Sequence, residues 1–293
     1  MAYDEGRVRR DGEVLPIECL RLRQNGKPRG GGNLHYHDYT ELLFGLCGSA
    51  QVLIGNSTSV LEAGGLTVIQ AGDAHDVCGN GTPCEYIVVK FLPELLISAE
   101  QTGAEFGYAL TLMEHSAERQ SVFSPAELRG TEIPAILRQM MAEWEEKAFG
   151  YELSLRADVT RVILFLLRRW REANPQLCAG VAPSDSRLMQ TALAYIGTHY
   201  AYISERDVAQ ACGISTVAVS RLFARTVKRS FPEYVRSVRL REAERLLLTT
   251  DLSVTDIALQ VGFSTSAYFI ARFREERGVT PYRFRRTKNG QTP

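Results

Sequence analysis

A segment in the C-terminal part of the chain occurs twice. Residues 204–223 read SERDVAQACGISTVAVSRLF, residues 253–273 read SVTDIALQVGFSTSAYFIARF, and the first ten residues of the two copies correspond at an offset of 49. Each copy opens on a serine with an aspartate three residues later, a variant of the capping box that begins helices. A glycine nine residues after the serine, Gly213 or Gly262, can take the positive φ that ends a first helix. The repeat therefore predicts two helix-turn-helix units.

The second helix of each unit is expected to begin at a further serine. Ser215 and Ser264 are the predicted N-caps. The interval from the turn glycine to the phenylalanine that anchors the second helix is ten residues in the first copy (Phe223) and eleven in the second (Phe273), so the second turn is one residue longer. A longer helix over residues 231–249 is predicted to join the two units.

Charge is divided unevenly along a chain whose formal net charge is zero. Residues 1–183 hold 17 Lys and Arg against 24 Asp and Glu, whereas residues 184–293 hold 17 against 10. The repeated segment thus lies in the half with a net charge of +7. Such a basic region is typical of a protein that binds a phosphate backbone, although a solvated basic surface gives the same count.

The N-terminal part has the pattern of a β protein. Short apolar runs are separated by Gly, Asn and Asp clusters, which favours a sandwich or small barrel. These runs are LPIECLRL, YTELLFGL, AQVLIG, LTVIQAG and EYIVVKFL, between residues 14 and 92. Two helices follow, over residues 133–144 and 153–172. The second is apolar around much of its circumference, so it packs either wholly against the barrel or partly against another subunit.

A stretch with two prolines, a glycine and small polar residues separates the two parts. It covers residues 173–187 and is predicted to be a linker. We therefore divide the chain into an N-terminal domain of residues 1–172, this linker, and a helical domain of residues 188–293 whose first helix spans 188–200.

Six cysteines show no CxxC pair and no zinc-like spacing. With neither a signal peptide nor an apolar run of about 18 residues, the sequence predicts reduced thiols in a cytoplasmic protein that has no contact with a membrane. A redox role for Cys47, Cys78 and Cys84 is the alternative.

Histidines and one glutamate form a second pattern in the N-terminal part. His35, His37, Glu41 and Gly48 follow H-x-H-x3-E-x6-G, and His75 ends a later G-x5-Q-x-G-x2-H. On strands, the first two histidines and the glutamate share a face, and a later strand can bring His75 beside them. Such a group can ligate a divalent metal, contact a small ligand, or serve the structure alone. The further polar candidates for a ligand pocket are Arg21, Arg23 and Tyr39.

Four motifs carry a resemblance to a known family. They are RLREAERLL at 239–247, DIALQVGFS at 256–264, SAYFIARFRE at 266–275 and GVTPYRFR at 278–285. With them, residues 188–286 resemble the DNA-binding domain of AraC/XylS transcription regulators, and the histidine pattern resembles the motifs of cupin barrels. The resemblance implies a cupin-like, jelly-roll N-terminal domain for effector binding and dimerisation, an all-α double helix-turn-helix domain, a DNA operator, a homodimer, and RNA polymerase as a further partner.

The resemblance also implies which residues meet DNA. In the first unit, the expected groove-facing positions are Val217, Ser220 and Arg221, with Arg225 toward the DNA backbone. In the second unit, the matching positions are Ser266, Ala267, Ile270 and Ala271. Arg221 is the expected base contact, because a guanidinium can bond guanine O6 and N7 together, with a phosphate contact as the alternative.

The second unit departs from the family at two of these positions. Ile270 and Ala271 stand where polar residues are usual, so we expect this unit to read few bases by hydrogen bonding. Arg272, Arg274 and Arg283 are expected to bind phosphates there.

Two functions remain open from the sequence. The first is a regulator of transcription in which a small effector, bound in the barrel, changes the affinity for DNA. The second is a metal-dependent cupin enzyme, an oxygenase or isomerase, that carries a DNA-binding domain. No second acid–base pair accompanies His35, His37, Glu41 and His75, which favours the regulator over the enzyme.

Overall fold

The computed structural model describes residues 3–4, 9–10, 13–14, 16–25, 34–37, 39–96, 103–113, 116, 118–175, 183–227, 229–277 and 279–286. The chain forms two units, which are considered separately. The first comprises Met1–Arg7, Pro16–Ile97 and Thr111–Ala179, and the second comprises Val8–Leu15, Ser98–Leu110 and Gly180–Pro293. This division differs from the predicted one, because two short segments of the N-terminal part group with the helical unit. No helix among the described residues is long and apolar enough to cross a membrane.

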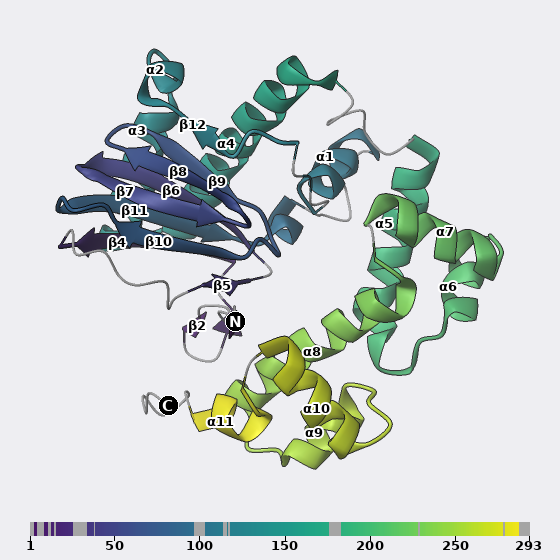
Figure 1. Cartoon of the computed structure of the whole chain (residues 1–293). Helices are drawn as coiled ribbons and strands as arrows, with labels where there is room; N and C mark the ends of the chain where they lie inside the picture. Colours follow the sequence, from purple (N-terminus) through teal and green to yellow (C-terminus); the bar gives the residue numbers. More distant parts are fainter. Residues whose placement is uncertain are drawn as a thin grey trace. The chain divides into compact units, whose positions relative to one another are not determined.

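The first unit is built on two five-stranded sheets (Figure 1). Its strands are β1 (Tyr3–Asp4), β4 (Ile17–Gln24), β5 (His35–Tyr36), β6 (Thr40–Cys47), β7 (Ser49–Ile54), β8 (Ser57–Glu62), β9 (Leu66–Ile69), β10 (His75–Gly79), β11 (Cys84–Phe91) and β12 (Val122–Phe123). The first sheet has the order β1-β5-β10-β7-β8, and the second has the order β12-β9-β6-β11-β4. The predicted β architecture is confirmed. Strand β8 was not predicted, because it is largely polar. Strands β2 (Arg9–Arg10) and β3 (Glu13–Val14) pair separately.

Side-chain alternation gives the second sheet two buried faces. One face packs on helices α3 (Ile133–Glu146) and α4 (Tyr151–Ala173), with Leu42 and Phe44 of β6 in that core. The other face meets the first sheet, and Leu43 lies there. Because the side-chain period of a strand is two, each position on β4, β6 or β11 belongs either to the helix side or to the interior between the sheets.

The remaining helical segments of the N-terminal part are short. They are η1 (Pro93–Leu96), α1 (Gly103–Met113) and α2 (Pro125–Leu128). Helix α4 is buried along one face, yet Leu153 and Leu164 are 73% and 44% exposed. The predicted apolar circumference of this helix is thus only partly covered within the unit.

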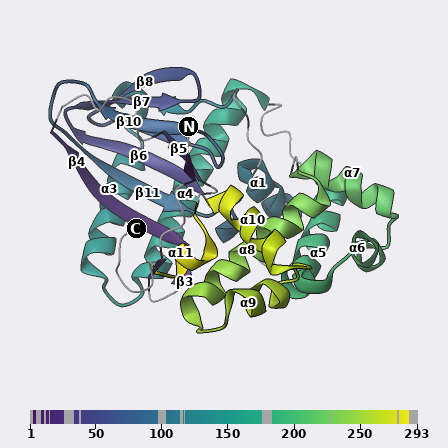
Figure 2. The same cartoon turned by 60° about the horizontal axis from the view of Figure 1, so that its bottom comes forward.

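The second unit consists mainly of helices (Figure 2). They are α5 (Pro183–His199), η3 (Tyr200–Tyr202), α6 (Glu205–Cys212), α7 (Thr216–Thr226), α8 (Phe231–Thr249), α9 (Val254–Gln260), α10 (Ser266–Arg277) and α11 (Pro281–Arg286). The two predicted helix-turn-helix units are α6–α7 and α9–α10, and α8 joins them over the predicted range. Helix α5 begins five residues inside the predicted linker, because proline is tolerated in a first turn. Residues 176–182 of that linker lie outside the described residues.

Helix caps follow the predicted serines with one exception. Ser204 and Asp207 form a reciprocal capping box, and Ser215 accepts from the backbone N–H of Ala218 at 3.2 Å. The predicted cap Ser264 is wrong: the N–H of Tyr268 donates to the Thr265 hydroxyl at 3.2 Å. The extra residue of the second turn lies before the cap, which moves the cap by one position.

The two turn glycines meet different surroundings. Both have positive φ, +66° at Gly213 and +93° at Gly262. A Cβ on Gly213 would meet nothing within 4 Å, whereas a Cβ on Gly262 would lie 1.9 Å from the carbonyl oxygen of Ala201. The turn of the second helix-turn-helix unit therefore packs closely against Ala201 in η3, the segment that follows α5.

Candidate functional site

Three histidines and one glutamate meet at one end of the interior between the two sheets. His35 on β5 lies directly across from His75 on β10, in the first sheet. Glu41 comes from β6 in the second sheet, and His37 lies just before that strand. One ligand atom from each of the four residues lies within 4.8 Å of the others. The predicted juxtaposition is confirmed.

The hydrogen bonds of two imidazoles assign their protons. Nδ1 of His37 lies 2.9 Å from the carbonyl oxygen of Tyr39, and Nδ1 of His75 lies 2.9 Å from that of Asp73. A carbonyl oxygen only accepts, so each Nδ1 carries the hydrogen. In a neutral imidazole the Nε2 atom is then an acceptor.

Both Nε2 atoms point at the same carboxylate oxygen. Oε2 of Glu41 lies 3.1 Å from Nε2 of His37 and 3.1 Å from Nε2 of His75. Three acceptors meeting at one point repel unless positive charge lies among them, either as protons on Nε2 or as a bound cation. The Nδ1 bonds to backbone carbonyls are those that orient metal-binding histidines. The donor set therefore fits a divalent cation.

Glu41 stays ionised although it is buried. Burial alone would raise its pKa, but hydrogen bonds from His37 and His75, which their Nε2 atoms donate when protonated, lower the pKa of this carboxyl to about 2. The side chains of both histidines are fully buried. Glu41 is thus a buried carboxylate, and either protonated histidines or a bound cation must supply the opposite charge.

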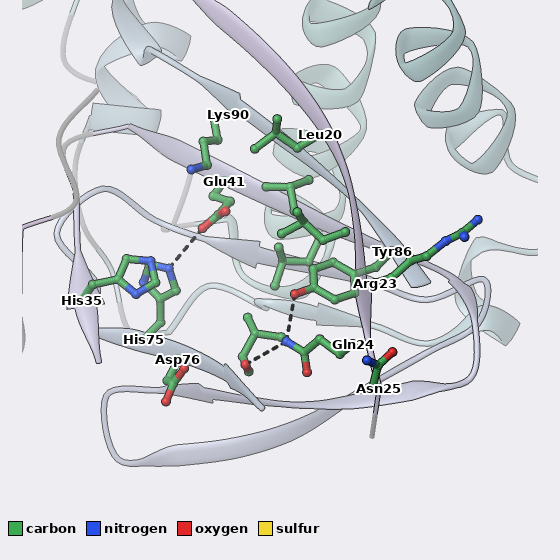
Figure 3. Close-up of a pocket in the computed structure, with 14 residues that line it drawn as sticks. Leu20, Arg23, Gln24, Asn25, His35, Glu41, His75, Asp76, Tyr86 and Lys90 are labelled. Atoms are coloured by element: carbon green, nitrogen blue, oxygen red, sulfur yellow. Dashed lines mark hydrogen bonds and ion pairs between the residues drawn. The ribbon is translucent and has the colours of Figure 1, made fainter. Parts of the chain in front are cut away.

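A cavity of about 610 Å³ opens beside the cluster (Figure 3). His35, Glu41 and His75 form one end of it, and apolar side chains form much of the wall. The apolar lining residues are Leu20, Leu22, Leu43, Val77 and Val88. Gln24 donates to the carbonyl oxygen of Val77 at 3.0 Å and to the Tyr86 hydroxyl at 3.1 Å. This size and mixed lining are typical of a site for one small molecule.

The three further pocket candidates from the sequence lie at or beyond the edge of this cavity. Arg21 faces the helix side of β4, where it pairs with Glu85 and Glu145, and it does not line the cavity. Arg23 borders the cavity, but its guanidinium pairs with Glu85 at 3.0 Å and points away from the histidines (Figure 3). Tyr39 is buried behind the cluster, with its ring stacked on His37 at 3.6 Å. The odd-numbered positions of β4 lie on the face of the sheet toward the helices, and the even-numbered positions Leu20, Leu22 and Gln24 line the cavity.

Sequence reasoning missed five polar lining residues. These are Gln24, Asn25, Asp76, Tyr86 and Lys90. Lys90 is the most informative, because it is 8% exposed and its Nζ lies 5.2 Å from the centre of the Tyr39 ring. A lysine within the apolar strand EYIVVKFL, in register with Glu41 on β6, is the signal that could have found it.

The second candidate site is the exposed face of α7. Val217, Ser220, Arg221 and Arg225 lie on this face, as predicted, at the i, i+3, i+4 and i+8 spacing of one helical stripe. Val219 and Phe223 are buried on the opposite side. Arg221 makes no hydrogen bond or ion pair with other described residues, so its guanidinium is available to a partner.

The matching face of α10 is less polar. Ala267 and Ala271 are exposed, whereas Ser266 is half-buried and Ile270 packs against the core of this unit. Arg272 pairs with Glu275 and lies over the ring of Tyr268, while Arg274 is exposed. Tyr268, 45% exposed, was not among the predicted contacts. Its place one residue after Ala267 on a recognition helix was the available signal.

Comparisons with known proteins cover both units. Residues 21–163 match the AraC-like ligand binding domain, and residues 208–287 match a helix-turn-helix domain. The chain is 23% identical to the HTH-type transcriptional regulator YdeC of Bacillus subtilis, over 93% of this chain and 92% of that protein. It is 26% identical to the transcriptional activator RhaS of Klebsiella pneumoniae, over 89% and 88%. ToxT from Vibrio cholerae has the same fold, with a TM-score of 0.51 at 12% identity over 94% of this chain and 99% of that chain.

A ligand-binding barrel joined to paired helix-turn-helix units defines a DNA-binding regulator of transcription that responds to a small molecule. These two relatives are transcription regulators, and the match covers nearly the whole length of each. The chain belongs to the AraC family of transcription regulators.

Proposed function

We propose that a small effector binds in the cavity beside Glu41 and His75 and changes the affinity of the helical unit for operator DNA. The observation that carries this proposal is a cavity of about 610 Å³ with the buried carboxylate of Glu41 at one end. A coupling of about 1 to 3 kcal/mol between the two sites would change DNA affinity from severalfold to about a hundredfold.

The lining favours an effector with a polar or acidic head and an apolar body. The polar head would lie near Lys90 and the histidines, and the apolar body would lie along Leu22, Val77 and Val88. One solved form of ToxT carries an unsaturated fatty acid, which is consistent with this class of effector for the same fold.

We further propose that the protein acts as a homodimer in the cytoplasm, where it meets operator DNA and RNA polymerase. Exposed Leu153 and Leu164 on α4 support a contact with a second copy, because they extend the apolar surface of a helix that is otherwise well buried. A dimer would place paired helix-turn-helix units on repeated half-sites.

A divalent cation at the histidine cluster is part of the proposal. His35, His37, Glu41 and His75 would hold it, and it would supply positive charge that attracts an acidic effector. Turnover of a substrate by the metal-loaded protein would instead favour the metal-dependent enzyme.

Chelator-treated protein is expected to take up about one equivalent of Mn²⁺, Ni²⁺ or Zn²⁺ in calorimetry. At 100 times the Kd, the metal should stabilise the fold by about 2.7 kcal/mol in thermal unfolding. His75→Ala should abolish uptake, whereas His199→Ala, an exposed histidine of the other unit, should bind metal normally. Equal uptake by both variants would show that the metal binds elsewhere, and no uptake by the parent protein would show that protons neutralise the cluster.

We also propose that α7 reads the operator sequence and that α10 mainly grips phosphates. Arg221→Ala should weaken the free energy of binding to the operator by about 1 to 3 kcal/mol and reduce discrimination between the operator and mutated sites. Arg274→Ala should weaken binding to all duplexes and make the salt dependence shallower by about 0.9 in log–log slope. Fluorescence anisotropy at several salt concentrations measures both. Uniform losses of equal size in the two variants would refute this division.

A further inference from the structure

Two polar side chains of the first recognition helix are held by acidic residues of the same unit. Arg225, in the last turn of α7, places its Nη2 2.5 Å from Oδ2 of Asp185 in α5. Ser220, five residues earlier on α7, donates its hydroxyl hydrogen to the carboxylate of Glu205 at the start of α6. The face of α7 that is expected to meet DNA therefore already carries carboxylate partners.

The members of the Arg225–Asp185 pair differ in freedom. Asp185 lies in the first turn of α5, where unpaired backbone N–H groups favour a carboxylate. Its side chain is 15% exposed, whereas that of Arg225 is 60% exposed. Asp185 is thus the more buried member of the pair, and Arg225 is the partner that can turn toward another anion.

A DNA phosphate and Asp185 would compete for the same guanidinium. An arginine already neutralised by a carboxylate releases few counterions from DNA, and a phosphate that approaches it also meets the negative charge of Asp185. We propose that Asp185 is an internal competitor for DNA at Arg225 and thereby lowers the DNA affinity of the first helix-turn-helix unit. This inference rests on the proposed phosphate contact of Arg225.

The position of Asp185 in the chain gives the competition a regulatory consequence. Helix α5 is the first element of the helical unit after residues 176–182, which connect it to the effector-binding part. A change at the start of α5 would alter how firmly Arg225 is held without any change in α7 itself. DNA affinity would then depend on the state of the connection.

The test is Asp185→Asn in the full-length protein, with a random-sequence 30-bp duplex as the probe. Asparagine keeps a side chain that is well tolerated at helix starts, so α5 should remain folded. We expect severalfold tighter binding at low salt. We also expect the slope of log K against log [NaCl] to steepen by about 0.9, the value for one more phosphate contact.

Glu242→Gln is the matched control. Glu242 pairs with Arg245 on α8 at 2.5 Å, so this variant also removes a carboxylate from beside an arginine and changes the net charge by the same amount, but not on a recognition helix. It should leave the salt slope unchanged. An equal steepening in both variants would mean that net charge alone acts, and would overturn the proposal.

Arg225→Ala in both backgrounds completes a double-mutant cycle. In the parent protein, we expect Arg225→Ala to lower DNA affinity less than twofold. In the Asp185→Asn background, we expect it to remove all of the affinity gained by that substitution.

If Arg225→Ala lowers DNA affinity equally in both backgrounds, Arg225 contacts phosphate but Asp185 does not compete, and only this inference fails. If it weakens neither, the proposed phosphate contact fails as well. Weaker binding of Asp185→Asn would show that Asp185 orients Arg225, which also overturns the proposal.

Discussion

Gly262→Ala is expected to destabilise the second helix-turn-helix unit by about 2 to 5 kcal/mol. A positive φ costs an alanine about 1 to 2 kcal/mol, and overpacking in a tight contact adds about 1 to 3 kcal/mol. Here the new Cβ would lie 1.9 Å from the carbonyl oxygen of Ala201, and backbone atoms cannot turn away as a side chain can. Hydrogen-exchange protection of α9 and α10 should fall accordingly.

Gly213→Ala is the internal comparison for this prediction. Gly213 occupies the equivalent turn of the first unit, also at positive φ, but no atom lies within 4 Å of an added Cβ. Only the backbone cost of about 1 to 2 kcal/mol should remain. Hydrogen exchange in α6–α7 and in α9–α10 measures the two losses of stability. Equal losses would mean that the backbone around Ala201 moves away from the new Cβ at little energetic cost.

Glu244→Ala is expected to cost about 3 to 5 kcal/mol of stability in the helical unit. Glu244 on α8 accepts a hydrogen bond from Arg277 at the end of α10, and the two side chains are 1% and 9% exposed. Removal of the carboxylate leaves a buried guanidinium without its main counter-charge. Urea unfolding, monitored by hydrogen exchange of the α8 and α10 amides, measures the loss of stability. The affinity of α10 for DNA should fall with it.

An exposed pair on the same helix provides the control for this second prediction. Glu242 and Arg245 are 24% and 48% exposed, so Glu242→Ala should cost less than about 1 kcal/mol. A similar cost for the two glutamates would show that burial does not decide the strength of these pairs, contrary to our expectation.

Much of this architecture could be predicted because the controlling signals are local. The capping serines, the turn glycines and the period of α8 depend on residues within a few positions of one another. The histidine cluster was also accessible, since the spacing of His35, His37 and Glu41 is visible in the sequence, although His37 lies outside β5 and Glu41 comes from the other sheet. Thr265 was missed as a cap because a one-residue insertion moves the cap without changing the residue types around it.

Other residues depended on contacts that the sequence does not show. Arg21 and Lys90 are both basic residues on apolar strands, yet one faces the helices and the other the interior, because both faces of the second sheet are buried. Asp185 lay in a stretch with the composition of a linker, and its pairing with Arg225 spans forty residues of chain. Such pairings are set by tertiary packing.

The four clustered residues come from both layers of the N-terminal domain. His35 and His75 belong to the first sheet, and Glu41 belongs to the second. A proton or cation held between Glu41 and the histidines therefore links the first sheet to the second. A cation bound there would reduce the motion of both sheets, including strands that do not contact the effector.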